Sequence, residues 1–273
     1  PLIGYSAINS GHIQDGTMTS ADIADGSITS ADLDPATFSS LLSWRIDGNA
    51  GTSAGTNFLG TSDNQPLELK VNGQRALRLE PNVKGQPNLT GGSVNNAIAL
   101  GNDAGTIAGG HQNTIWFQAD YATVSGGQAN RIAAQANHAT IAGGQGNSVG
   151  TNSSHVAIGG GWDNQVGTNS NNTVIGGGKG NSVGENSPGS VIGGGVDNDI
   201  GADSPRATVL GGFNNNIFSN AGFSTIGGGK MHTINSGSDH ATIGGGYQHY
   251  IGTNAPEATI GGGWANVIQA NAF

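Results

Sequence analysis

Two pairs of histidines are the side chains in this sequence that are best suited to bind a metal ion or an anion. His232 and His249 lie seventeen positions apart, and so do His138 and His155. If residues seventeen apart lie above one another, each pair stacks, and several chains together would form a ring of imidazoles. In a competing interpretation, which the sequence favours, His232 and His249 replace a hydrogen-bonded Asn of the neighbouring repeats.

Catalytic groups are harder to find. Asp197 and Asp199 flank Asn198, and Asp15 and Asp25 share a register, but solvated turns explain both pairs. The Gly runs resemble phosphate-binding loops only superficially, because no Lys-Ser or Lys-Thr follows them and no helix is predicted after them. The chain has no Cys, and no Ser–His–Asp arrangement can be argued from it. We therefore predict a non-enzymatic protein that needs no cofactor.

The position after a recurring Gly-Gly pair is the most variable in size. Its aromatic members, Trp162, Phe213, Tyr247 and Trp264, could stack on sugar rings and are candidate surface-binding residues. In the alternative, which the sequence favours, they cover a groove between neighbouring chains. The full set is His111, Gln128, Gln145, Trp162, Lys179, Val196, Phe213, Lys230, Tyr247 and Trp264.

These candidates belong to a seventeen-residue repeat that occurs ten times between residues 105 and 271. Each copy has an Ile or Val, then the Gly-Gly pair, then an Asn or His, then a second Ile or Val. A constant length indicates one coil per repeat, with equivalent residues stacked about 4.8 Å apart. We predict an all-β parallel solenoid (a β-roll) of ten coils with two short strands each. A partial copy, with Gly91-Gly92, Asn96 and Ile98, is expected to be a starting cap.

The outer faces of the two strands differ. The residue before the first Ile or Val is small, often β-branched and never charged, whereas the equivalent residue of the second strand is mostly polar. A thin roll with one uncharged face is expected to associate with copies of itself, and we predict a homotrimer. We name the first set the outer column: Thr106, Thr123, Thr140, Ala157, Val174, Val191, Thr208, Thr225, Thr242 and Thr259.

The chain is expected to have three parts. Residues 1–40 have an apolar residue at every fifth position and form a stalk or attachment segment. Residues 41–89 form a small connector with a β-hairpin, in which two alternating strands flank Asn72-Gly73, the preferred type I′ turn. Trp44, Ile46, Phe58 and Leu59 are expected to cover its apolar face. Residues 90–273 form the solenoid head.

Composition excludes several classes of partner. Gly accounts for 50 of 273 residues, only 10% of residues are charged, and the formal net charge is −9. No basic stripe exists, so nucleic acid is not an expected partner. No run of 18 apolar residues exists, so no membrane span is expected.

Three segments resemble known fibre proteins. DGSITSADL is similar to stalk segments of phage tail fibres, within pentads that resemble pentapeptide repeats, and FLGTSDNQPLELKVNGQRALRLEP resembles the connector that precedes their repeats. HVAIGGGWDNQVGTNS resembles the head repeats of trimeric autotransporter adhesins. That resemblance implies a trimer of left-handed parallel β-rolls over roughly residues 90–271. The repeat length and the GGG corners differ from that family.

We therefore expect a trimeric tail-fibre or surface-appendage protein, located outside the cell or on a virion-like particle. Its partners would be further copies of itself, a cell-surface glycan or receptor, and a fibre base or the next subunit through the N-terminal segment. One alternative is a structural filament subunit that assembles head to stalk. A glycan-degrading tailspike would need a carboxylate cluster that the sequence does not show.

Overall fold

The computed structural model describes residues 16–28, 32 and 48–272. The chain divides into two compact units, Pro1–Gly60 and Thr61–Phe273. The 3-10 turn η2 (Ser20–Asp22) lies in the first unit, and the 24 β-strands of the described residues lie in the second.

The described part of the pentad segment has two short turns and not a coil, η2 and a second turn in which the Ser27 N–H donates to the Ala24 carbonyl at 2.9 Å. The backbone N–H and the hydroxyl of Thr19 both donate to the Asp22 carboxylate, at 2.9 and 2.7 Å, and fix η2. The apolar pentad residues Met18, Ile23 and Ile28 are exposed. An intrachain coil that buries every fifth side chain is therefore absent from residues 16–28, and the rest of the stalk prediction lies outside the described residues.

The predicted hairpin is confirmed and continues directly into the solenoid. Strand β1 (Leu67–Val71) pairs antiparallel with β2 (Gln74–Glu80), and β2 pairs antiparallel with β3 (Asn88–Gly91). Asn72 and Gly73 both have positive φ, +49° and +73°, as a type I′ turn requires.

Two of the residues expected to cover this hairpin, Phe58 and Leu59, belong to the first unit, whereas the hairpin belongs to the second. Both side chains are more than half exposed, and the expectation that they cover the hairpin stays a prediction. Trp44 and Ile46 lie outside the described residues.

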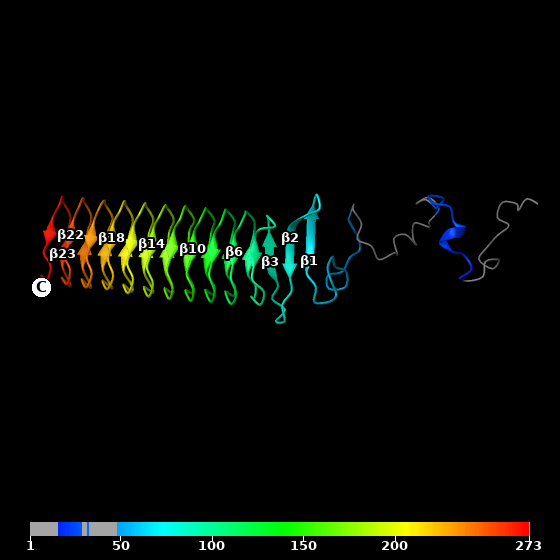
Figure 1. The fold of residues 1–273 in the computed structure, drawn as a ribbon, viewed down its shortest axis with the longest axis horizontal. Helices are drawn as coiled ribbons and strands as arrows, with labels where there is room; N and C mark the ends of the chain where they lie inside the picture. Colours follow the sequence, from blue (N-terminus) through cyan, green and yellow to red (C-terminus); the bar gives the residue numbers. More distant parts are fainter. Residues whose placement is uncertain (1–15, 29–31, 33–47, 273) are drawn as a thin grey trace, which may run out of the picture. The chain divides into compact units, whose positions relative to one another are not determined.

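The second unit is a parallel β-solenoid, as predicted, with strands stacked side by side along its axis (Figure 1). The first sheet has 13 strands, in the order β1, β2, β3 and then the odd-numbered strands to β23; the second has 11, from β4 to β24. The partial copy forms a complete coil, because β3 and β4 (Ala97–Ile98) pair with β5 and β6. Eleven coils are therefore present, one more than the ten predicted.

Each coil contributes one strand to each sheet. The remaining strands of the first sheet are β5 (Thr106–Ile107), β7 (Thr123–Val124), β9 (Thr140–Ile141), β11 (Ala157–Ile158), β13 (Val174–Ile175), β15 (Val191–Ile192), β17 (Thr208–Val209), β19 (Thr225–Ile226), β21 (Thr242–Ile243) and β23 (Thr259–Ile260). Those of the second sheet are β6 (Thr114–Ile115), β8 (Arg131–Ile132), β10 (Ser148–Val149), β12 (Gln165–Val166), β14 (Ser182–Val183), β16 (Asp199–Ile200), β18 (Asn216–Ile217), β20 (Thr233–Ile234), β22 (Tyr250–Ile251) and β24 (Val267–Ile268).

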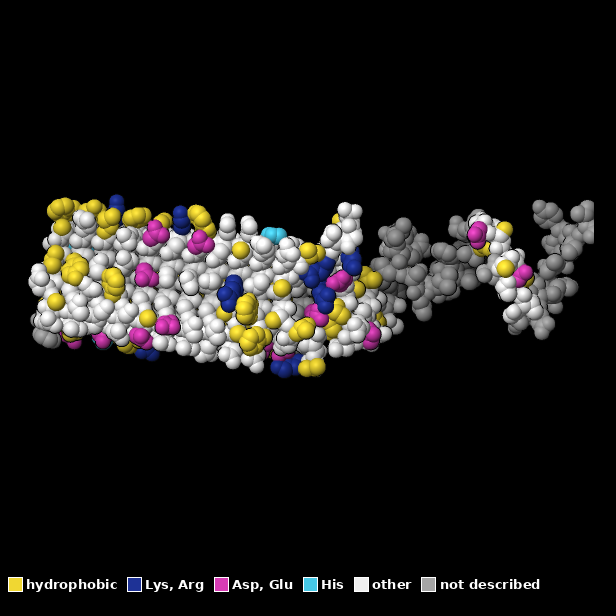
Figure 2. All heavy atoms as spheres, in the orientation of Figure 1, with side chains coloured by type: hydrophobic (Ala, Val, Ile, Leu, Met, Phe, Trp, Pro, Cys, Tyr) yellow, Lys and Arg dark blue, Asp and Glu magenta, His cyan; other side chains and the backbone are white. Residues whose placement is uncertain are grey.

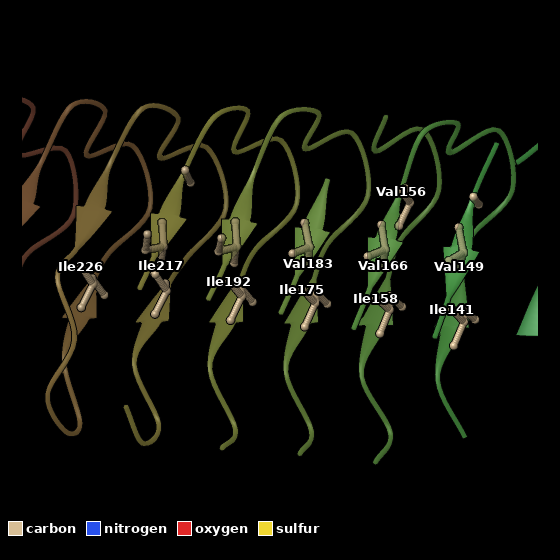
Figure 3. Packing of buried hydrophobic residues seen from close by; sticks show 14 of the residues in the cluster. Ile141, Val149, Val156, Ile158, Val166, Ile175, Val183, Ile192, Ile217 and Ile226 are labelled. Carbon is tan, nitrogen blue, oxygen red and sulfur yellow. The ribbon is translucent and has the colours of Figure 1, made fainter. Parts of the chain in front are cut away.

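The core is a narrow seam between the two sheets. Figure 3 shows two rows of branched side chains that face each other, such as Ile141 and Ile158 from one sheet and Val149 and Val166 from the other. Each row repeats with the strand register, because Ile158 pairs with Ile141 and Val166 with Val149. The predicted alignment of residues seventeen apart is confirmed.

Small polar residues complete the core at the turn that leads back to the first sheet. Ser153 and Ser170 are buried there, and the Ser153 hydroxyl accepts from the Ser170 backbone N–H at 3.0 Å and donates to the Gly167 carbonyl at 2.7 Å. This column of Ser and Ala was not recognised in the sequence. Its regular spacing in the repeat would have identified it.

The glycine corner allows the coils to stack closely. Gly161 has a φ of +93°, and a Cβ added to it would collide with the carbonyl oxygen of Gly178 in the next coil. The same clash recurs along the stack, so Gly is required at this position both for its φ and for the approach of the neighbouring backbone.

Candidate binding surface along one edge of the solenoid

The ten variable residues after the Gly-Gly pairs form a continuous line, which we call the ribbon. An isolated parallel bridge joins each member to the next, from His111 and Gln128 to Tyr247 and Trp264. Each ribbon residue follows a tight glycine corner, so its side chain is held at the edge of the solenoid and not in its core. Figure 2 shows hydrophobic and basic side chains along one long edge of the solenoid, which matches the composition of the ribbon.

The structure brings the four predicted aromatic residues onto this one line and adds two lysines. Trp162, Phe213 and Trp264 are 46%, 41% and 71% exposed, and Tyr247 is partly buried. The sequence analysis named the aromatic residues as candidates but gave no role to Lys179 and Lys230, although both stood in the same register.

The lysines lie over the aromatic rings. The Lys179 ammonium is 4.2 Å from the centroid of the Trp162 ring. The Lys230 ammonium is 5.4 Å from the Phe213 ring and 5.7 Å from the Tyr247 ring. Tyr247 stacks on Trp264 with centroids 6.4 Å apart. These cation–π and stacking contacts pre-order the side chains at a solvated edge.

The middle and C-terminal sections of the ribbon differ in charge. In the corner segments 158–166, 175–183 and 192–200, Lys179 is accompanied by Asp163, Asp197 and Asp199. In segments 209–217, 226–234, 243–251 and 260–268, Lys230 is the only Lys, Arg, Asp or Glu. This middle section of the ribbon, Trp162 to Val196, is therefore acidic, whereas the C-terminal section, Phe213 to Trp264, presents one cation among neutral residues.

The buried Asn residues behind the ribbon form a hydrogen-bonded ladder along the solenoid axis. The Asn147 amide donates to Asn130 Oδ1 at 3.1 Å, to the Gly143 carbonyl at 2.9 Å and to the Gly161 carbonyl at 3.1 Å. One side chain thus links three successive coils and fixes the glycine corner from inside.

His232 and His249 continue this ladder and stack as predicted, with ring centroids 4.9 Å apart and an angle of 4° between the rings. His232 Nδ1 accepts from the His249 backbone N–H, and His249 Nδ1 accepts from the Asn266 backbone N–H, both at 3.1 Å. Both side chains are buried, and their Nε2 atoms make no hydrogen bond of ordinary geometry.

This arrangement supports the interpretation that His replaces Asn, since Nδ1 accepts the backbone N–H that the Asn Oδ1 atom accepts in the other coils. It gives no support to the metal ring, because the two imidazoles face the interior of their own chain. Burial lowers the pKa of His232, and the neighbouring His249 lowers it further, while the carbonyls of Gly246 and Gly228 act in the opposite direction.

A second line of rings lies on the opposite turn of each coil. Tyr121, His138 and His155 stack with successive centroid distances of 4.9 Å, and all three are exposed. Phe223 stacks on His240 in the same register. The sequence analysis noted the spacing of His138 and His155 but missed the aromatic partners.

Within residues 16–28, 32 and 48–272, no cluster of three or more His, Cys, Asp or Glu side chains is arranged to hold a metal ion. The same residues contain no helix with the length and apolar character of a membrane span.

Comparison with known proteins adds no family. No protein-family model matches the sequence, and no curated protein matches it.

Proposed function

We propose that this chain is the subunit of a non-enzymatic, homotrimeric fibre that acts outside the cell or on a virion-like particle and attaches to a cell-surface glycan or receptor. The observation that carries the proposal is the outer column of the first sheet. It presents Thr, Ala and Val at ten successive coils without a single charge, and Val174 is 39% exposed in the isolated chain.

A second copy of the same chain is the occupant that suits this face. The column is uniform along the axis, so two parallel copies would meet without a charge mismatch at any coil. The outer positions of the second sheet include Arg131 and Asp199, which makes that face better suited to water. Each coil also buries only a thin seam between its sheets, so further burial through the first sheet would add stability. In a closed ring of three copies, each of these uncharged faces would contact a neighbouring copy.

Attachment is proposed from the ribbon. Exposed aromatic and basic side chains recur along a rigid edge, and a trimer would present three such edges. Several weak contacts along each edge, multiplied by three, would give a high avidity.

Light scattering after size-exclusion chromatography tests the assembly. We expect three times the mass of one chain. Introducing charge with Val174→Glu and Val191→Glu should give monomers, because each copy would place like charges at the interface. The matched control Ser182→Glu, on the outer face of the second sheet, should leave the trimer intact. A monomeric wild-type chain would refute the proposal, and endless threads in micrographs would favour a filament subunit instead.

A further inference from the structure

We infer that the C-terminal section of the ribbon, Phe213, Lys230, Tyr247 and Trp264, binds an extended anionic polysaccharide. This inference rests on the proposed attachment function and names the class of glycan. It concerns four consecutive coils, joined by the bridges from Phe213 to Lys230, from Lys230 to Tyr247 and from Tyr247 to Trp264.

The first argument is the position of the cation. The Lys230 ammonium lies between two rings, 5.4 Å from the centroid of Phe213 and 5.7 Å from that of Tyr247. The rings hold the ammonium by cation–π attraction, which does not neutralise its charge. A ligand anion could therefore pair with Lys230 while its sugar ring lies against Phe213 or Tyr247.

The second argument is local charge. The chain as a whole has a formal net charge of −9, yet Lys230 is the only Lys, Arg, Asp or Glu in the four corner segments of this section. The neighbouring positions on the same corners are Asn214, Met231, Gln248 and Ala265, which repel neither a carboxylate nor a sulfate. The acidic middle section of the ribbon lacks this property, because Asp163, Asp197 and Asp199 accompany Lys179 there.

The third argument is shape. The ribbon is an open edge and not a pocket, and its side chains repeat at the coil spacing of about 4.8 Å. A sugar unit in an extended chain is comparable in length with one coil, so neighbouring units would meet neighbouring ribbon residues. Trp264 is the most exposed ring of this section, at 71%, and Tyr247 stacks on it with centroids 6.4 Å apart. Sugar rings stack on exposed aromatic rings through their apolar C–H surfaces. A linear polymer with flat faces and regular anionic groups fits this line.

The test uses the full chain and two probes that differ mainly in charge: polygalacturonate and its methyl ester. Binding is measured by affinity electrophoresis and calorimetry. We expect the wild type to bind polygalacturonate more tightly than the ester, and binding to weaken as salt rises. Trp264→Ala should reduce affinity about tenfold, the effect of losing one stacking contact worth about 1.4 kcal/mol. Lys230→Gln should reduce it about threefold to fivefold, as expected for an exposed ion pair.

The matched controls lie in the acidic middle section of the ribbon. Trp162→Ala and Lys179→Gln remove the same side-chain types, and each should change affinity less than about twofold, the scale of a neutral surface change. Equal binding of polygalacturonate and its ester, equal losses in both sections, or no binding of polygalacturonate would each overturn the inference.

The mass of every variant is measured in parallel. If Trp264→Ala alters the oligomeric state, the ribbon is an interface between copies of the chain, and the inference fails. If the wild type is trimeric but does not bind polygalacturonate, the inference fails while the proposed fibre stands. If the wild type is monomeric, the proposed fibre fails, and the binding data still decide whether the ribbon recognises the polymer.

Discussion

Asn130 accepts two hydrogen bonds from Asn147 through a single oxygen atom: its Oδ1 accepts both the backbone N–H of Asn147 at 3.0 Å and the side-chain amide at 3.1 Å. The pair repeats with Asn164, Asn181, Asn198 and Asn215. All of these side chains are buried. The ladder therefore satisfies, coil by coil, backbone groups that the glycine corner would otherwise leave unpaired.

Removing one rung should be costly. Asn164→Ala deletes the bonds to Asn147 Oδ1 and to the carbonyls of Gly160 and Gly178. We expect a loss of about 3 kcal/mol in the free energy of unfolding, because several buried groups lose a partner at once. The neighbouring Gln165→Ala, on the exposed outer face, should change it by less than about 0.5 kcal/mol. Urea melts of both variants make the comparison, and similar losses would show that the ladder is dispensable.

The glycine corner should tolerate no side chain. Gly161→Ala combines a φ of +93° with a collision against the Gly178 carbonyl oxygen, whereas Gly101 has a similar φ, +88°, and open space around it. We expect Gly101→Ala to cost about 1 kcal/mol for backbone strain alone. Gly161→Ala should cost at least about 3 kcal/mol more, since the backbone of the next coil must move. Thermal melts would contradict this explanation if the two variants were equally stable.

Much of the fold could be predicted because one period governs it. Ile141, Ile158 and Ile175 recur at a constant spacing without an insertion, and a constant spacing permits only a coil of fixed length. Asn72-Gly73 identified the hairpin because few residues adopt the turn that it needs. The first coil was predicted only as a partial copy because its first strand, Asn88–Gly91, lacks the Ile or Val of later copies and has Thr90 paired with Ile107 instead.

The alignment of the ribbon residues along one edge could be predicted from the sequence, but the contacts between their side chains could not. Register alone placed Trp162 and Trp264 on the same edge. Whether Lys230 lies over Phe213 and Tyr247 depends on side-chain rotamers, which a repeat pattern does not specify. The Ser153 column was missed, although its spacing is regular, because Ser and Ala are also common in exposed turns and these residues are buried.

The buried side chain of His232 should make stability depend on pH. The folded-state pKa of His232 is lowered, chiefly by burial, so the unfolded chain binds a proton more readily than the folded one. The stabilising contribution is therefore complete above the unfolded value of about 6.5 and is lost as the pH falls from there towards the folded value. We expect the urea midpoint of the wild type to decrease as the pH is lowered from 7.5 to 5.

Replacing both rings with Asn should remove this part of the pH dependence. The variant His232→Asn with His249→Asn restores the amide donor that the unpartnered Nε2 atoms fail to supply, so it should also be more stable at pH 7.5 by about 1 kcal/mol. The control is His138→Asn with His155→Asn, whose rings are exposed. An identical pH dependence in the wild type and in the buried double variant would rule out this origin.

The N-terminal end of the solenoid depends on one guanidinium group. Arg75 donates to the backbone carbonyls of Val94 and Asn96 at 3.0 and 2.9 Å, and so closes the first coil. We expect Arg75→Ala to reduce the free energy of unfolding by about 2 kcal/mol, since hydrogen bonds from a charged group are lost. Hydrogen exchange should accelerate in residues 88–98 and stay unchanged beyond residue 200, because each coil contacts only its neighbours. Lys70→Ala, on the exposed hairpin strand, is the control, and uniform acceleration along the chain would contradict the prediction.

A coil of invariant length gives the molecule an adjustable reach. Deleting residues 159–175 would place Gly176 where Gly159 stood, and equivalent residues of successive coils would stay aligned along the whole solenoid. Duplication or loss of such a unit by recombination would move the two ends of the solenoid apart or together in steps of about 4.8 Å. The number of repeats thus sets the length of the solenoid, and it can change in evolution without any change to the sequence at either end.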